Sequence, residues 1–172
     1  MSSPLNFVLL DGARLHEALD EAMEINKSGQ SLFIGKSQQK LSSVAPHLFS
    51  LEESGDTVNW FWQYGWGNAW GVLFSSERSP EECVRHFRRF LIVKTEEGKE
   101  LYFRFYDPRV LRIFLPTCDK NQVLEFFGPV DYFLVEDEDK EYAIQFSHQN
   151  GTLKQHRFKA ADIFSELAST LN

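Results

Sequence analysis

The stretch Leu101-Tyr-Phe-Arg-Phe-Tyr-Asp-Pro-Arg-Val-Leu111 alternates between two kinds of side chain until it reaches a proline. Period-two alternation over residues 101–106 places Tyr102, Arg104 and Tyr106 on one face of a predicted strand and the apolar residues between them on the other. Proline suits the first turn of a helix, and aspartate is a strong helix cap. The chain is therefore predicted to change from strand to helix at Asp107-Pro108.

Arginines gather around this corner and on a helix predicted to begin at Ser79-Pro80 and to end near residue 90. On that helix Arg85, Arg88 and Arg89 have the i, i+3, i+4 spacing that places side chains on one face, where like charges repel. They need acids, carbonyl groups or an anionic ligand. Asp107 is the expected internal partner, because a guanidinium pairs with a carboxylate through two bonds. An acidic protein partner and a phosphate or nucleic acid are the alternatives.

Composition indicates one soluble globular domain spanning residues 1–172. The chain is 42% hydrophobic and 25% charged, and its net charge of -7 argues against a nucleic acid as the main partner. The first residues have no basic segment, and the apolar run that follows at 7–10 is too short for a signal peptide or a membrane span. We therefore expect a cytoplasmic protein with no membrane partner. Cys83 and Cys118 are predicted to be buried thiols, and a disulfide between them is the alternative.

The order of predicted elements indicates a mixed α/β fold, a sheet with parallel and antiparallel strands and flanking helices in a single lobe. Strands over 6–10 and 31–35 with a helix over 13–26 between them form a predicted β-α-β unit, whose two strands should be parallel. A loop over 36–43 follows. Further helices are predicted over 56–66, 79–90, 108–115, 119–127 and 160–171. Further extended segments are predicted over 45–51, 71–75, 91–95, 101–106, 131–135, 142–146 and 153–158, with 91–95 and 101–106 paired antiparallel and the last three forming a meander.

All four tryptophans of the chain lie within eleven residues, together with Tyr64. Tryptophan and tyrosine are over-represented at binding hot spots, so part of this cluster is a candidate docking surface. The competing interpretation is that the cluster packs a helix and a strand onto the sheet. The candidate partner-binding residues are Trp60, Trp62, Tyr64, Trp66, Trp70, Arg85, Arg88, Arg89, Arg109 and Arg112.

Motifs that would indicate catalysis are weak in this sequence. Cys83 and His86 are three residues apart on a helix, but no motif places an orienting residue beside them. The histidines show no metal-ligand spacing, and neither a phosphate-binding glycine loop nor a nucleophile elbow is present. The acidic run 136–139 is predicted to be a solvated hairpin turn rather than a calcium loop. We expect no metal, no cofactor and no enzymatic activity.

Several blocks of the sequence together resemble one known family. They are 9–13, 45–48, 70–75, 86–91, 103–111 and 127–129, and the block Phe103-Arg-Phe-Tyr-Asp-Pro-Arg109 is the most specific of them. In their order and spacing the chain is similar, over about residues 5–135, to the bacterial type VI secretion adaptor or effector chaperone family, a conserved domain of unknown function. Within the matching motif, His86, Arg104, Tyr106, Asp107 and Pro108 are interpreted as structural.

The resemblance implies a non-enzymatic cytoplasmic protein that binds a toxic effector and helps to load it onto the trimeric VgrG spike. Family members carry a variable lobe after the conserved one, whereas this chain has only a predicted hairpin and helix over 131–172. A single lobe would then supply the surfaces for the effector protein and the VgrG spike protein. Two hypotheses of other classes remain: a small hydrolase or nuclease using Asp11 or Asp107 beside arginines, and a regulatory protein that binds an anion at the arginine face.

Overall fold

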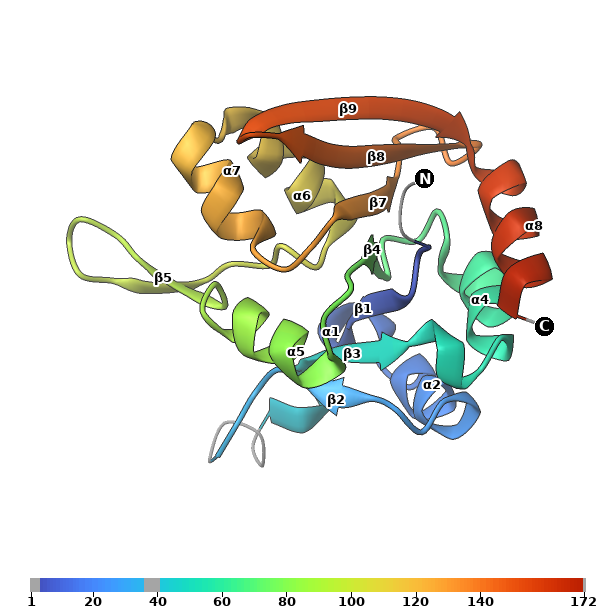
Figure 1. The fold of residues 1–172 in the computed structure, drawn as a ribbon. Helices are drawn as coiled ribbons and strands as arrows, with labels where there is room; N and C mark the ends of the chain where they lie inside the picture. The colour runs from blue at the N-terminus through green and yellow to red at the C-terminus, as the bar shows by residue number, and fades with distance from the viewer. Residues whose placement is uncertain (1–3, 36–40, 172) are drawn as a thin grey trace.

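The central feature of the computed structural model is a sheet in the strand order β2-β3-β1-β4-β7-β8-β9 (Figure 1), and the residues described are 4–35 and 41–171. The strands span β1 Phe7–Asp11, β2 Gln30–Ser31, β3 Pro46–Ser50, β4 Gly71–Ser75, β7 Tyr132–Glu136, β8 Tyr142–Gln149 and β9 Thr152–Lys159. A separate hairpin pairs β5, Ile92–Lys94, with β6, Glu100–Tyr102. Every neighbouring pair of these strands is antiparallel.

Helices cover both faces of this sheet, which confirms the α/β class. They are α1 Gly12–Leu15, α2 Ala18–Ile25, α4 Asp56–Trp60, α5 Pro80–Arg88, α6 Pro108–Phe114, α7 Lys120–Phe127 and α8 Ala160–Leu171, and a π-helical turn over Phe61–Gly65 continues α4. Residues of α1, α2, α4 and α8 join one hydrophobic cluster, and residues of α5, α6 and α7 join the other. Each central strand therefore lies between two apolar layers.

Burial on both faces explains why the central strands are continuous apolar runs. In β1, Val8 and Leu10 belong to the cluster under α2 and α4, whereas Phe7 and Leu9 belong to the cluster under α5 and α7. All residues of β1, β3, β4 and β7 are buried. A strand that is buried on both sides needs no polar residues at alternate positions.

The parallel pairing predicted between segments 6–10 and 31–35 is wrong. Only Gln30–Ser31 forms a strand there, and it pairs antiparallel with β3, which in turn pairs antiparallel with β1. β1 and β2 therefore run in the same direction, but β3 separates them. An apolar run indicates that both faces of a strand are buried, and it does not reveal which strand will lie beside it.

Two predicted elements are shorter in the structure than the sequence pattern suggested. The helix predicted over 13–26 is interrupted after Leu15, where His16 adopts a positive φ of 53°. The strand predicted over 101–106 ends at Tyr102, and Phe105 and Tyr106 are then both buried, with exposed fractions of 0% and 4%. The chain turns into the core at this point, where the Phe105 ring stacks on Phe87, so the alternation of faces does not continue.

Local helix signals are confirmed. Ser79 and Glu82 form a capping box at the start of α5, and Asp119 and Gln122 form another at the start of α7. The side chain of Asp107 caps α6, as predicted. The C-terminal strands form the predicted meander, with Asn150 and Gly151 in the tight turn. Residues 36–40 of the predicted loop and the first three residues of the N-terminal segment lie outside the described residues.

Gly128, which ends α7, is predicted to tolerate a side chain poorly. Its φ is 47°, and a Cβ atom there would lie 2.3 Å from Cε1 of the buried His86. Gly98, in the β5–β6 turn, is a matched control because its φ is 82° but no atom lies within 4 Å of an added Cβ. We expect Gly98→Ala to lower the free energy of unfolding by about 1 kcal/mol and Gly128→Ala by about 3 kcal/mol. Urea unfolding measures both, and equal losses would contradict the proposed clash.

Candidate interaction surfaces

The corner at Asp107 is held by one arginine. Asp107 Oδ1 accepts hydrogen bonds from the backbone N of Arg109 at 2.9 Å and from its Nε at 3.0 Å, and Oδ2 accepts from Nη2 at 2.7 Å. Burial alone would raise the pKa of this carboxyl, but the bonds from Arg109 outweigh burial and hold the pKa below its usual range. Pro108 follows in the first turn of α6. Asp107 therefore caps the helix and forms the ion pair with Arg109 at the point where α6 begins.

A second ion pair, also between a buried carboxylate and a partly exposed arginine, joins this corner to the sheet. Asp11, the last residue of β1, is fully buried, and its Oδ2 accepts a bond from Arg104 in the turn before α6. Asp11 Oδ1 and Arg104 Nε are buried without a hydrogen-bond partner among the described residues. Burial first, and the charge of Asp11 second, raise the pKa of Tyr106 to about 12. The predicted motif residues Arg104, Tyr106 and Asp107 thus lie together at the junction of β1 and α6.

Glu136 is a third buried carboxylate at this corner, and the sequence pattern missed it. It lies at the end of β7 with 5% of its surface exposed, so the prediction of a solvated turn is wrong for this residue. Its carboxylate accepts bonds from the backbone N of Gly67 at 2.7 Å and of Ala69 at 3.0 Å. Its carbonyl oxygen accepts a bond from Arg112. These partners are far from Glu136 in sequence, so no local signal distinguishes it from the exposed acids Glu138 and Asp139.

The arginines of α5 do not pair with Asp107, contrary to the prediction, because Arg109 and Arg104 occupy that region. Arg88 donates to the carbonyl oxygens of Leu32 at 2.9 Å and Ser31 at 3.1 Å. Arg89 lies 3.4 Å from Glu125 in an exposed ion pair, and the side chain of Arg85 is exposed. Arg85 and Arg89 line one hollow together, whereas Arg88 turns toward the loop after β2.

The same helix places Cys83 and His86 in separate environments. Cys83 is fully buried, and burial raises the pKa of its thiol. The Nε2 atom of His86 lies 2.7 Å from the carbonyl oxygen of Phe126, and burial lowers the pKa of this histidine. His86 therefore joins α5 to α7. Cys83 and Cys118 are both free thiols, and Cys118 is half-buried rather than buried.

The aromatic cluster divides into a buried part and an exposed part. Trp60 and Trp66 are 5% and 8% exposed, and Trp66 Nε1 donates to the carbonyl oxygen of Lys140 at 2.8 Å. Half-buried Trp70 packs against Trp60. Trp62 and Tyr64, by contrast, are 37% and 48% exposed. The packing interpretation therefore applies to Trp60, Trp66 and Trp70. Within the cluster, only Trp62 and Tyr64 offer substantial ring surface to solvent.

Trp62 is held in a defined orientation. Its ring stacks on Phe164 of α8 with a centroid distance of 4.5 Å, and Phe164 also meets Trp66 edge to face at 5.0 Å. Beside Trp62 is a hollow of about 470 Å³ that Lys140 and Lys159 also line. A fixed aromatic ring beside a partly charged hollow makes this region a candidate interaction surface.

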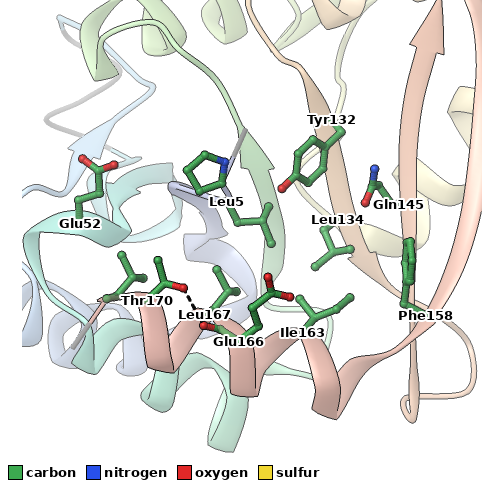
Figure 2. Close-up of a pocket in the computed structure, with 12 residues that line it drawn as sticks. Leu5, Glu52, Tyr132, Leu134, Gln145, Phe158, Ile163, Glu166, Leu167 and Thr170 are labelled. Carbon is green, nitrogen blue, oxygen red and sulfur yellow. Dashed lines mark hydrogen bonds between the residues drawn. The ribbon is translucent and has the colours of Figure 1, made fainter. Parts of the chain in front are cut away.

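Another hollow, which sequence reasoning did not suggest, lies between α8 and strands β7 to β9 (Figure 2). Its volume is about 530 Å³. Figure 2 shows Ile163 and Leu167 of α8 facing Leu134 and Phe158 of the sheet across it. Two carboxylates, Glu52 and Glu166, contribute to the lining. The lining comes from four distant parts of the chain, so only the folded structure shows that these residues meet.

Comparison with known proteins identifies one match. A family model described as a domain of unknown function, DUF4123, matches residues 6–125. No match is found among the curated proteins or among the solved structures. Among the described residues, no helix is long and apolar enough to cross a membrane, and no group of three or more histidine, cysteine, aspartate or glutamate residues is arranged to hold a metal ion.

The charge of Asp107 is predicted to stabilise the fold in a pH-dependent way. Because its pKa is lowered in the folded state, the stabilisation is complete above the unfolded value of about 3.9 and is lost as the pH falls through the folded value. Asparagine also caps helices, so Asp107→Asn removes the charge while keeping the cap. We expect this variant to lose about 1–2 kcal/mol in the free energy of unfolding at pH 7. The difference between variant and wild type should become smaller below about pH 4.

Urea unfolding between pH 3 and pH 7 measures this difference. Glu24→Gln, at an exposed position near the end of α2, is the control and should change the free energy of unfolding by less than about 0.5 kcal/mol. A loss for Asp107→Asn that is the same at every pH would show that the charge of Asp107 is not the cause.

Proposed function

The chain belongs to the DUF4123 family, and on that premise we propose that it is a non-enzymatic adaptor, or chaperone, that binds a type VI secretion effector and helps to load it onto the VgrG spike. The sequence blocks that resemble the secretion adaptors lie almost entirely within the matched residues 6–125. In this proposal the protein works in the cytoplasm, needs no cofactor, and holds its partners by non-covalent contacts.

The observation that carries the proposal is the exposure of Trp62 and Tyr64 on a rigid base. Hot-spot residues at protein interfaces are enriched in tryptophan and tyrosine, and a side chain that is already ordered loses little freedom on binding. Trp62 is ordered by its stack on Phe164, and the turn that follows its helical segment is held by bonds from the backbone N of Gly67 and Ala69 to Glu136. A partner that covers these rings would bury apolar surface without rearranging the fold.

The state of the carboxylates also supports binding rather than catalysis. A nucleophile or general base must reach a substrate with a free lone pair. Asp107 is 2% exposed, and both of its oxygens accept bonds from Arg109. Asp11 is fully buried and paired with Arg104. In our proposal these groups stabilise the corner between β1 and α6, which is the role expected of the matching motif.

Loss of the exposed rings is expected to weaken effector binding. We predict that Trp62→Ser combined with Tyr64→Ser lowers the affinity for the effector by about tenfold or more, because truncating two hot-spot aromatic residues removes at least about 1.4 kcal/mol. The measurement is isothermal titration calorimetry with a purified candidate effector, chosen from the products of the genes that neighbour the gene of this chain. Ile113→Ser, on the exposed side of α6, is the control and should bind as the wild type does.

Two results would count against the adaptor. One is a wild-type chain that binds neither the effector nor the VgrG protein in purified form. The other is turnover of a nucleic acid or ester substrate that is abolished by Asp107→Asn, which would favour the hydrolase hypothesis.

A further inference from the structure

A second apolar surface lies on the opposite side of the molecule from Trp62 and Tyr64. Figure 1 shows the β5–β6 hairpin projecting from the left of the body, whereas α4 and α8 lie at the right. The π-helical turn that carries Trp62 and Tyr64 continues α4 directly. Sequence analysis predicted this hairpin but assigned it no role. An adaptor has to hold two proteins at once, so a separate surface on the far side is significant for the proposed function.

Both faces of the hairpin expose large apolar side chains. Ile92 and Tyr102 are paired across the two strands and are 47% and 59% exposed. Val93 and Leu101 are paired on the opposite face and are 42% and 41% exposed. A two-stranded hairpin gains little stability by itself, and clustered apolar side chains in water commonly mark an interaction site. These four residues are therefore not explained by the folding of this chain alone.

One of the two faces borders a hollow of about 360 Å³. Ile92 and Tyr102 form one wall, and the buried residues Leu32, Phe33 and Leu91 lie behind them. The rings of Phe33 and Tyr102 are 6.0 Å apart. Val93 and Leu101, on the other face, do not line this hollow. The Ile92–Tyr102 face thus borders an apolar binding pocket that is large enough for one or two side chains of a partner protein.

The rim of the hollow is positively charged. Arg88 lines it in a fixed position, because its guanidinium is bound to the carbonyl oxygens of Ser31 and Leu32. Arg89 lines it too, and extends into a neighbouring hollow of about 480 Å³ with Arg78 and Arg85. Among the described residues that line the two hollows, Glu82 is the one acid. Arg89 also meets Glu125 at 3.4 Å, but both side chains are about 60% exposed, so this pair is weak and exchangeable.

We infer that the Ile92–Tyr102 face, with Arg88 and Arg89 at its rim, docks a segment of a second partner protein that carries a large apolar side chain flanked by acidic residues. The apolar side chain fills the hollow, and the flanking carboxylates meet the arginines. The inference rests on the proposed adaptor function and extends it: Trp62 and Tyr64 contact one of the two proteins, effector or spike, and the hairpin contacts the other.

The test uses the full chain, the purified effector and the purified VgrG protein, with each pairwise affinity measured by calorimetry. Ile92→Ser combined with Tyr102→Ser removes the apolar wall of the hollow. Val93→Ser combined with Leu101→Ser is the matched control, because it also removes two exposed apolar side chains, from the other face of the same hairpin. Circular dichroism checks that both variants are folded. All of the substituted side chains are exposed, so both variants should fold.

The expected result is that the Ile92/Tyr102 variant binds one partner about tenfold to thirtyfold more weakly and the other unchanged, while the control binds both as the wild type does. The weakened partner should be the one that the Trp62/Tyr64 variant still binds. Its affinity should also fall as NaCl is raised, and this dependence should be reduced in Arg89→Ser. Tiled peptides of that partner should identify a binding segment with an apolar residue beside aspartate or glutamate.

Three outcomes would overturn the inference. If the Ile92/Tyr102 variant binds both proteins as the wild type does, the docking surface is wrong although the adaptor function stands. If the Val93/Leu101 control loses as much affinity as the Ile92/Tyr102 variant, the apolar hollow is not the binding site. If the binding peptide is rich in lysine, the assigned chemistry is wrong. A wild-type chain that binds neither protein would instead refute the proposed function and this inference together.

Discussion

The ion pair between Arg104 and buried Asp11 joins the end of β1 to the turn before α6, and a chain of contacts depends on it. That turn places Asp107, which caps α6 and binds Arg109. Arg112 on α6 then donates to the carbonyl oxygen of Glu136, whose carboxylate holds the backbone of Gly67 and Ala69. Buried charges are costly unless they are paired and hydrogen-bonded, so the corner tolerates one arrangement of these elements. That arrangement also positions the turn after Trp66.

This framework of contacts supports the proposed adaptor function, in which the protein presents surfaces to its partners. The central strands lie between two helical layers, and in the aromatic core on the α5–α7 side the ring of Phe133 contacts those of both Phe87 and Phe126. The exposed tryptophan and the apolar hairpin lie on opposite sides of this frame (Figure 1). Residues beyond the family match contribute to this frame, because β7 to β9 complete the sheet and α8 supplies Phe164 beneath Trp62.

The candidate surfaces were only partly visible in the sequence. The density of tryptophan in residues 60–70 marked the aromatic cluster, yet nothing in that pattern separates exposed Trp62 from buried Trp66. The separation depends on Phe164 and Lys140, which are far along the chain. The arginines of α5 were predicted to share one face and to pair with Asp107, but Arg109 binds Asp107 instead. Arg88 turns away from Arg85 to bind the carbonyl oxygens of Ser31 and Leu32. The hairpin was predicted from Gly98 and alternating residues, whereas its exposure on both faces depends on how it projects from the body.

The sequence by itself determined the local elements of this protein. Caps such as Ser79 with Glu82 and Asp119 with Gln122 act over three residues, so they operate before any tertiary contact is made. Only the tertiary structure decided the strand order, the antiparallel pairing throughout the described sheet, the burial of Glu136 and the division of the aromatic cluster. The physical reason is that an apolar strand gains a similar free energy from burial against any neighbour that excludes water. The choice of neighbour is made by contacts between residues that are distant in sequence, such as Asp11 with Arg104.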